Sequence, residues 1–392
     1  MPRSRRLVAG AAIAVVALIA TACGSGEDAT GAPVSRPQAP GEPDTPAGGE
    51  GPAEPVAVEG VEVVDLDEPI ALVVRPGDDD HLWVAERPGR ILRLVVSPDG
   101  GLASEGEAVL DISDDTTIEN ERGLLSMTFS PDGEALYVSH TNAQGDSRVA
   151  SYAIDGNSVD EASRTELLAI DQPFGNHNGG HIVWGPDDAL WLGLGDGGSG
   201  DDPENRAQDP EDPLGSMVRI DPESGETDVV AIGLRNPWRF AFDPADDSLW
   251  IADVGQQQIE EVNRLAADEI DGANLGWSGY EGSLEYLDGE GRRPDDPVMP
   301  AFEYAREGAN CSITGGFVYR GDAIDGLAGA FLFADYCAGD VRAVRLADDG
   351  TLAAELDLDV QVEAPISFGA DADGEPFVLS GGGSVVRLVP AA

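Results

Sequence analysis

The stretch IVWGPDDALWLGLGDGG, residues 182–198, contains the unit that decides the fold of this chain. An apolar run leads into a tight Pro-Asp-Asp turn, and a second apolar run follows with an aromatic residue near its start. Apolar residues that alternate on both sides of such a turn predict a β-hairpin. The unit occurs six times, and its apolar–aromatic core falls at residues 82, 136, 190, 249, 331 and 377.

Six copies of one hairpin predict an all-β fold, a six-bladed β-propeller that spans residues 57–392. The uneven spacing of the copies suits four-stranded blades joined by loops of different length. No long helical periodicity competes with this interpretation. An eight-stranded sandwich is the alternative, but a sandwich would not repeat one hairpin six times.

Residues 1–22 have the features of an export signal. Arginines precede an apolar core that is too short to span a bilayer comfortably, and small residues lead to Cys23. The ending ATAC resembles a bacterial lipobox, so we expect a lipidated Cys23 that anchors an exported protein at the cell surface. A plain secretory signal is the alternative, with a periplasmic or secreted product. Residues 23–56 are rich in Gly, Pro, Ala and Glu, which predicts a flexible tether.

The charge balance excludes some classes of partner. The chain has 23 basic and 74 acidic residues, a net charge of −51, and none of the basic residues is lysine. The electric field of so negative a chain repels nucleic acid and anionic lipid surfaces. We therefore expect no nucleic-acid partner, and membrane contact only through the lipid anchor. Adaptation to a salty habitat is a hypothesis that this composition suggests.

The two cysteines outside the signal region, Cys311 and Cys337, predict one disulfide. An even pair in an exported chain is most simply oxidised. The bond would close a loop of about 25 residues, worth roughly 3 kcal/mol of stability. A pair of free thiols is the alternative.

Two residues with catalytic potential lie at the open end of one hairpin. If its turn is formed by residues 185–188, His177 and Asp196 are equally far from the centre, and antiparallel pairing brings them together. Glycines beside both residues permit unusual backbone angles and a close approach by a ligand. A histidine held by a carboxylate keeps one tautomer and becomes a better base.

The next hairpin repeats this geometry, since Arg235 and Gln256 are equally far from a turn at residues 244–247. Successive hairpins of a propeller direct equivalent ends to the same face, so one cluster near the axis is expected from His177, Asp196, Arg235, Asn236, Gly255 and Gln256. Each residue alone fits an ordinary turn or cap, but their convergence from two blades favours a reaction site. The other three histidines lack such neighbours and are left outside it.

Several longer phrases resemble one known family. They include ERGLLSMTFSPDG, NHNGGHIVWGPDDALWLGLGDGG, GLRNPWRFAFDP, VGQQQIEEVN, NLGWSGYEG, CSITGGFVYRG and FADYCAGDV. In this order they are similar to the glucose/sorbosone dehydrogenase family, the soluble aldose dehydrogenases that carry pyrroloquinoline quinone (PQQ) and calcium on a six-bladed propeller. The resemblance runs from about residue 61 to the C-terminus.

The resemblance implies a role for each matching position. His177 matches the general base, Asp196 the carboxylate that orients it, and Arg235 the cation that stabilises the reduced quinone. Cofactor contacts are implied for Asn236 and Glu121. The carbonyls of Gly255 and Gln256 match those that hold the cofactor's calcium, and Glu261 with the carbonyl of Leu275 matches a second, structural calcium site.

The chain departs from the family in the charges that clamp the cofactor. PQQ carries three carboxylates, which well-known members bind with a lysine and a C-terminal pair of arginines. This chain has no lysine, and no Arg-x-Arg pair follows residue 320. Arg239, in the phrase NPWRF, is the substitute that we expect, because a guanidinium binds a carboxylate with two hydrogen bonds.

The expected function is PQQ- and calcium-dependent oxidation of an aldose at C1 to the lactone, with an external electron acceptor. A side chain cannot accept hydride, so the chemistry requires a cofactor. The alternative is a non-catalytic propeller of the Hedgehog-interacting type that binds carbohydrate or protein. A calcium-dependent sugar lactonase ranks last, because the marked positions do not supply a cage of carboxylates.

Overall fold

The structure is a computed structural model that describes residues 56–97 and 100–391. The predicted signal peptide, the lipidation site Cys23 and all but the last residue of the tether lie outside the described residues. Within the described part, the strands run from Val58 to Pro390. No helix there is long and apolar enough to cross a membrane.

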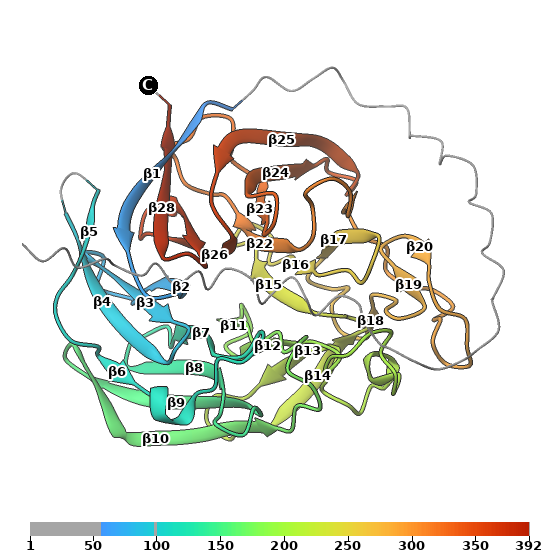
Figure 1. The fold of residues 1–392 in the computed structure, drawn as a ribbon, viewed down its shortest axis with the longest axis horizontal. Helices are drawn as coiled ribbons and strands as arrows, with labels where there is room; N and C mark the ends of the chain where they lie inside the picture. Colours follow the sequence, from blue (N-terminus) through green and yellow to red (C-terminus); the bar gives the residue numbers. More distant parts are fainter. Residues whose placement is uncertain (1–55, 98–99, 392) are drawn as a thin grey trace, which may run out of the picture. The chain divides into compact units, whose positions relative to one another are not determined.

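Six sheets surround a common centre, which confirms the predicted six-bladed β-propeller (Figure 1). Each blade contributes one innermost strand, and these are β2 (Pro69–Val74), β7 (Leu124–Phe129), β11 (Ile182–Trp184), β15 (Pro237–Phe242), β22 (Ile313–Val318) and β26 (Pro365–Ala370). Innermost strands of adjacent blades pack against one another around the ring, and at the third blade β15 packs mainly against β12 (Leu190–Leu194).

The repeated apolar–aromatic core always falls in the second strand of a blade. These strands are β3 (His81–Glu86), β8 (Ala135–Thr141), β12 (Leu190–Leu194), β16 (Leu249–Asp253), β23 (Phe331–Asp335) and β27 (Pro376–Ser380). Nearly every residue in them is buried, because both faces of this strand pack against adjacent blades. The outer strands and edges are β4 (Arg90–Val96), β5 (Leu102–Ser104), β6 (Leu110–Asp111), β9 (Ser147–Asp155), β10 (Ser158–Ile170), β13 (Ser216–Ile220), β14 (Thr227–Ile232), β17 (Ile259–Leu265), β18 (Ala273–Asn274), β21 (Phe302–Ala305), β24 (Asp340–Leu346) and β25 (Leu352–Gln361).

The two ends of the described chain close the ring. Strand β1 (Val58–Asp65) pairs antiparallel with β28 (Ser384–Pro390) and completes the last blade from the opposite end of the sequence. A short hairpin, β19 (Tyr280–Glu281) and β20 (Leu284–Glu285), is inserted between the third and last strands of the fourth blade.

The hairpin that carries His177 is offset from the predicted register. Strands β11 and β12 pair Ile182 with Leu192, which centres the turn on residue 187 rather than between residues 186 and 187. The turn is longer than predicted because Asp188 adopts a left-handed conformation, with a φ of 60°, and the turn closes with a hydrogen bond from the N–H of Gly185 to the carbonyl of Ala189 at 2.8 Å.

The centre of the ring is filled by a guanidinium. Arg239, on β15, is 2% exposed, and its side chain donates to Ser367 Oγ at 2.9 Å and to the carbonyls of Ile70 and Leu125 at 2.9 and 3.3 Å. These partners belong to the sixth, first and second blades. One side chain therefore connects the fourth blade with three others.

Candidate active site

The side chains of His177 and Asp196 meet at the open end of the third blade. Nδ1 of His177 lies 2.7 Å from Oδ1 of Asp196, and both residues are buried. The same Oδ1 accepts the N–H of Gly198 at 2.9 Å, and Oδ2 accepts the indole N–H of Trp277 at 2.8 Å. Because both oxygens accept from N–H donors, the carboxylate acts as an acceptor, so the imidazole donates from Nδ1 and leaves Nε2 free to take a proton.

The local backbone holds the histidine in this position. His177 has a left-handed φ of 53°, which few residues with a side chain adopt. A Cβ on Gly195 would collide with the carbonyl oxygen of His177, so glycine is required on the facing segment. The glycines that mark this hairpin therefore permit the close backbone approach that the sequence suggested.

Trp277 joins this pair to the next blade. Besides its bond to Asp196, its ring lies 5.6 Å from the guanidinium carbon of Arg235 and stacks on Tyr286 at 5.4 Å. The motif NLGWSGYEG contains this tryptophan, but the sequence offered no reason to assign it a role. Its importance follows only from the position of its indole between the carboxylate and the cation.

Arg235 is held rigidly beside these residues, at the open end of the blades that we call the mouth. Nε donates to Oε1 of Gln256 at 2.9 Å, and Nη1 donates to the carbonyl of Val254 at 2.8 Å. Its backbone N–H donates to the carboxylate of Asp253 at 2.8 Å, while burial raises the pKa of that carboxyl to about 6. The expected proximity of Arg235 and Gln256 is thus a direct contact.

Asn236 links three blades beside this cation. Its Oδ1 accepts the N–H of Gly179 at 3.2 Å, and its Nδ2 donates to Oε2 of Glu121 at 3.1 Å. The structure therefore brings both expected cofactor-contact residues together. Arg239 lies apart from them, in the core of the ring, where each of its guanidinium nitrogens donates to the protein and burial lowers its pKa to about 9. The structure gives no support to Arg239 as a clamp for a carboxylate.

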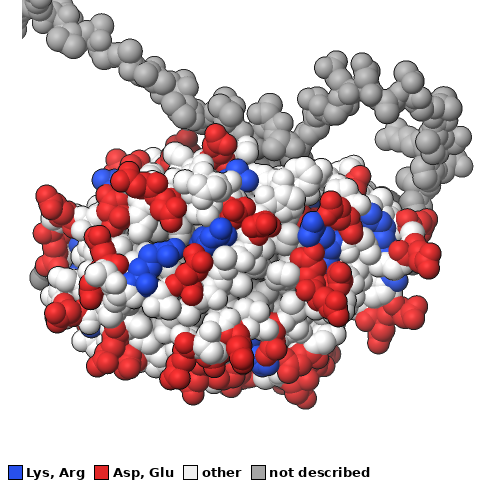
Figure 2. Space-filling view, turned by 90° about the horizontal axis from the view of Figure 1, so that it is seen from below, with Lys and Arg blue, Asp and Glu red and all other residues white. Residues whose placement is uncertain are grey.

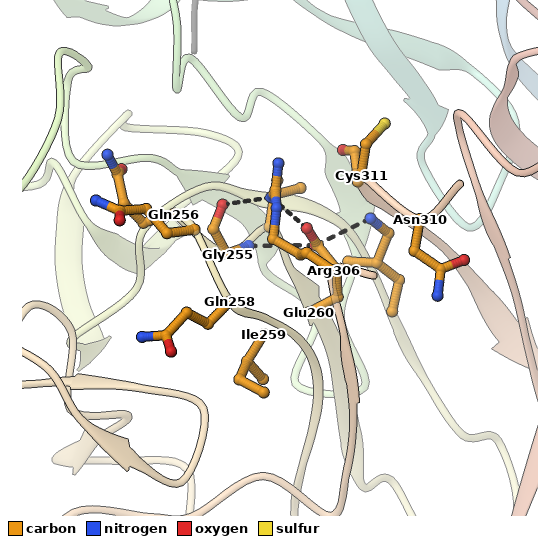
Figure 3. Close-up of polar contacts among 12 residues, drawn as sticks. Gly255, Gln256, Gln258, Ile259, Glu260, Arg306, Asn310 and Cys311 are labelled. Carbon is orange, nitrogen blue, oxygen red and sulfur yellow. Dashed lines mark hydrogen bonds and ion pairs between the residues drawn. The ribbon is translucent and has the colours of Figure 1, made fainter. Parts of the chain in front are cut away.

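The carbonyl of Gly255 has an unforeseen partner (Figure 3). Nη1 of Arg306 donates to this oxygen at 2.8 Å and also contacts Oε1 of Glu260. Oε2 of Glu260 accepts the N–H groups of Ile313 at 3.0 Å and Gly255 at 3.2 Å. Burial raises the pKa of Glu260 to about 8, and the charge of Arg306 opposes that shift.

A small, partly enclosed cavity of about 10 Å³, the size of one water or ion, adjoins this mouth, and Arg235, Gly255 and Trp277 belong to its lining. Its lining also includes the acidic residues Asp253, Glu261 and Glu281, together with Leu275. Burial and then the charge of Asp253 raise the pKa of Glu261 well above its usual value. Three of the four calcium-ligand candidates, Gly255, Glu261 and Leu275, therefore line one cavity, and Asp253 and Glu281 add acidic side chains that the sequence did not mark.

Glu281 is positioned by a loop that wraps around one of its oxygens. Oε1 accepts the backbone N–H groups of Gln256, Gln257 and Gln258 at 2.8, 2.5 and 2.7 Å. Oε2 is buried and has no hydrogen-bond partner among the described residues. An unpartnered carboxylate oxygen in a cavity with two further carboxylates has the donor chemistry that a hard divalent cation such as Ca²⁺ requires.

The predicted disulfide between Cys311 and Cys337 is formed, with the Cα atoms 5.6 Å apart. The carboxylate of Asp335 accepts the backbone N–H groups of both cysteines, at 3.0 and 2.9 Å. The two loops are therefore held together by hydrogen bonds as well as by the covalent bond.

Comparison with known proteins identifies the family to which the chain is similar. The family model for glucose/sorbosone dehydrogenase matches residues 66–380. Among curated proteins, the HIPL1 protein of Arabidopsis thaliana is 32% identical over 50% of this chain and 34% of its own length. The Hedgehog-interacting protein of Mus musculus is 26% identical over 69% of this chain and 41% of its own length, so the chain spans less than half of either relative.

A solved structure, the PQQ-bound form of an aldose sugar dehydrogenase from Streptomyces coelicolor, has the same fold. It is 20% identical, with a TM-score of 0.68 over 86% of this chain and 99% of its own length.

Proposed function

The chain belongs to the glucose/sorbosone dehydrogenase family, and from that premise we propose that it is a PQQ- and calcium-dependent aldose dehydrogenase that converts the C1 hydroxyl of a sugar to the lactone. The observation that carries the proposal is the 2.7 Å contact of His177 with Asp196, joined through Trp277 to a fixed Arg235. A module that only binds a partner has no evident need of this arrangement.

His177 acts as the general base in this proposal. With Nδ1 bonded to Asp196, Nε2 accepts the proton of the anomeric hydroxyl, and the adjacent carboxylate stabilises the imidazolium that forms. Positioned proton transfer of this kind contributes about 10²- to 10⁴-fold in rate.

Arg235 and Asn236 form the polar wall against which the cofactor lies in this proposal. PQQ, when bound, supplies the hydride acceptor that no side chain can provide. The guanidinium of Arg235 is aimed by Gln256 and Val254 before any ligand arrives, so its positive charge stabilises developing negative charge without reorganisation. Glu121 contributes indirectly, by orienting the amide of Asn236.

The two calcium positions that the family implies differ in their fit to these residues. The cavity offers ligands of the type that calcium prefers, because the acidic residues Asp253, Glu261 and Glu281 line it and one oxygen of Glu281 lacks a partner among the described residues. We propose that Glu261 and the carbonyl of Leu275 hold a structural calcium there. At the mouth, the carbonyl of Gly255 accepts an N–H of the Arg306 guanidinium, whose positive charge opposes a second cation at this oxygen.

A non-catalytic propeller that binds a protein partner is the second candidate. Similarity to the Hedgehog-interacting protein of Mus musculus supports it, as does the absence of lysine from a chain that would bind a trianion. The retention of His177, Asp196 and Arg235 in mutual contact favours the enzyme.

We further propose that the protein is exported, is anchored through a lipid on Cys23 and passes electrons to an external acceptor. Labelling of cells with a radioactive fatty acid tests the anchor, and a Cys23→Ser variant should lose the label and leave the membrane fraction.

The test of function is reconstitution. We expect the protein, loaded with PQQ and Ca²⁺, to reduce a redox dye when aldoses are added, at low or at high salt. Absence of dye reduction with a panel of aldoses, together with no spectral change of the cofactor, would favour the binding module.

A further inference from the structure

The guanidinium of Arg306 occupies a position next to the proposed cofactor site. Arg306 follows β21, and its own backbone N–H donates to the carbonyl of Gln258 at 2.8 Å, which fixes the residue beside the Gly255–Ile259 loop. Its Nη1 then bonds the carbonyl of Gly255 at 2.8 Å (Figure 3). This contact joins the fourth blade's outer edge to the mouth.

The carbonyls of two consecutive residues at this mouth accept from two different arginines. Val254 accepts from Arg235 and Gly255 accepts from Arg306, each at 2.8 Å. A calcium ion binds oxygen at about 2.3–2.6 Å, so an ion on the Gly255 oxygen would lie at most about 5.4 Å from the Arg306 nitrogen. A divalent ion and a guanidinium would then repel each other in a buried site that screens charge poorly.

The carboxylate of Glu260 forms an ion pair with Arg306 and has no oxygen left for another cation. Glu260 is fully buried, contacts Nη1 of Arg306 with Oε1, and uses Oε2 for the N–H groups of Ile313 and Gly255. The other acidic residues nearby, Asp253, Glu261 and Glu281, line the small cavity, and Gly255 belongs to its lining as well. The carbonyl oxygen of Gly255 accepts from the guanidinium of Arg306, so the acidic side chains of the cavity are the remaining ligands for a calcium ion.

We propose that Arg306 permanently occupies the cation position at the Gly255 carbonyl that the family resemblance assigns to calcium, so that the chain binds calcium only among the acidic side chains of the small cavity. The side chain of Arg306 is 13% exposed, and among the described residues its bonds use Nη1, so Nη2 is available to an acidic group of a ligand. The consequence for the cofactor rests on the proposed function. PQQ bound at this mouth would face the positive charge of the Arg306 side chain in place of a calcium ion.

The first test counts calcium ions in the protein without cofactor. Calcium is titrated calorimetrically into the full chain after treatment with a chelator, for wild type, Arg306→Ala, Arg306→Gln and Arg264→Ala. Arg264 is a matched control, because its ion pair with Asp246 is more exposed and lies outside the cavity. We expect one calcium for wild type and the control, and two for Arg306→Ala. The variant Arg306→Gln keeps more of the side chain and covers the case in which the alanine variant does not fold.

The stoichiometry alone decides the inference. Two calcium ions in wild type, or no additional ion in either folded Arg306 variant, would overturn it. Glu261→Gln alone should bind no calcium, because it loses the ion in the cavity. The double variant Glu261→Gln/Arg306→Ala should bind one ion, at the Gly255 carbonyl, so the pair of variants assigns each ion to its position.

The second test measures PQQ binding by quenching of tryptophan fluorescence, without turnover. Once the cavity site is saturated, a further tenfold rise in calcium should change the affinity of wild type less than twofold. The same rise should strengthen binding by Arg306→Ala at least tenfold, because the vacated position then accepts calcium. Wild type that binds no PQQ at any calcium concentration would refute the proposed function, while the calcium count would still test the inference.

Discussion

Individual residues in this protein have roles that depend on their partners rather than on their type. Arg235, Arg239 and Arg306 all donate to backbone carbonyls, yet the first borders the mouth, the second fills the centre of the ring and the third is paired with Glu260. His177 similarly differs from the other histidines because the carboxylate that fixes its tautomer also accepts from Trp277 at the mouth. The role of each of these residues is therefore set by the groups that it contacts in the folded chain.

The proposed base can be tested by substitution at His177 and Asp196. We expect His177→Ala to lower kcat by about 10²- to 10⁴-fold, because the anomeric proton loses its acceptor. Asp196→Asn should also lower kcat, since an amide can stabilise the wrong tautomer of the imidazole. PQQ binding, followed by fluorescence quenching, should stay within about twofold in both variants. Undiminished turnover in His177→Ala would show that another group takes the proton.

A second histidine should govern the response of stability to acid. His140 is buried, neither ring nitrogen has a partner among the described residues, and burial lowers its pKa to about 4. The unfolded chain, with a pKa near 6.5, binds the proton more tightly, so stability is lost as the pH falls from 6.5 towards 4. We expect His140→Phe to lose about 2 kcal/mol less than wild type between pH 7 and pH 4.5, measured by urea unfolding.

The effect of His140 is separable from the nearby charged residues that also influence its proton, which are Asp115, Arg148, Arg164 and Glu166. These residues are present in both proteins, so their contribution cancels in the difference. His81→Gln, at a histidine paired with Asp78, serves as a control. Equal acid sensitivity of wild type and His140→Phe would contradict the prediction.

At the scale of elements, short loops are stabilised by carboxylates that accept several backbone N–H groups. Asp335 holds both cysteine loops, and Glu281 holds the loop at Gln256–Gln258. Such contacts satisfy loop backbone that would otherwise be buried without partners. They also pre-position the groups above them, including the carbonyl of Gly255.

Because Asp335 keeps the two loops in place, the disulfide should act mainly on the unfolded chain. Replacement of both Cys311 and Cys337 by Ser should reduce the free energy of unfolding by about 3 kcal/mol, from the entropy of a loop with a separation of 26 residues. Urea unfolding of the variant and of reduced wild type should agree. A loss below about 1 kcal/mol in both would mean that the bond adds little to the constraint from Asp335.

At the scale of the whole molecule, the ring is closed in two ways. Strand β1 completes the last blade from the N-terminal side, and Arg239 connects the fourth blade to the first, second and sixth through its guanidinium. Acidic side chains cover much of the face seen in Figure 2, with arginines set among them. The contacts that close the ring therefore stabilise the folded state, while repulsion among the acidic side chains on its surface destabilises it.

The central guanidinium should be essential for stability. Arg239→Leu leaves the carbonyls of Ile70 and Leu125 buried without this donor, at about 1–3 kcal/mol for each unsatisfied group. We expect a loss of several kcal/mol in the free energy of unfolding, with the KM for sugar unchanged in the folded fraction. A specific loss of PQQ affinity at full stability would instead restore Arg239 as a cofactor ligand.

Salt should stabilise the protein, because its net charge is −51. Screening shortens the range of repulsion from about 10 Å at 0.1 M salt to about 3 Å at 1 M. We expect the midpoint of thermal unfolding to rise steadily between 0.1 and 2 M NaCl. A midpoint that does not change over this range would contradict both this prediction and the hypothesis of a salty habitat.

The sequence by itself determined the number of blades and the strand that carries each repeat, because period-two alternation and turn residues act over a few neighbouring positions. It also determined that His177 and Asp196 share one hairpin end, since antiparallel pairing follows from the position of the turn. The exact register required the structure, because it depends on the left-handed conformation of Asp188.

Only the tertiary structure decided which residues surround this hairpin end. Trp277 reaches Asp196 across 81 positions, Arg306 reaches Gly255 across 51, and Arg239 reaches Ile70 across 169. No local pattern encodes such contacts, because the partner of a buried donor is chosen by whichever acceptor the packed blades leave within reach. For the same reason, Arg239, which the sequence analysis assigned to a ligand, lies in the core, and Arg306, which that analysis did not mark, borders the mouth.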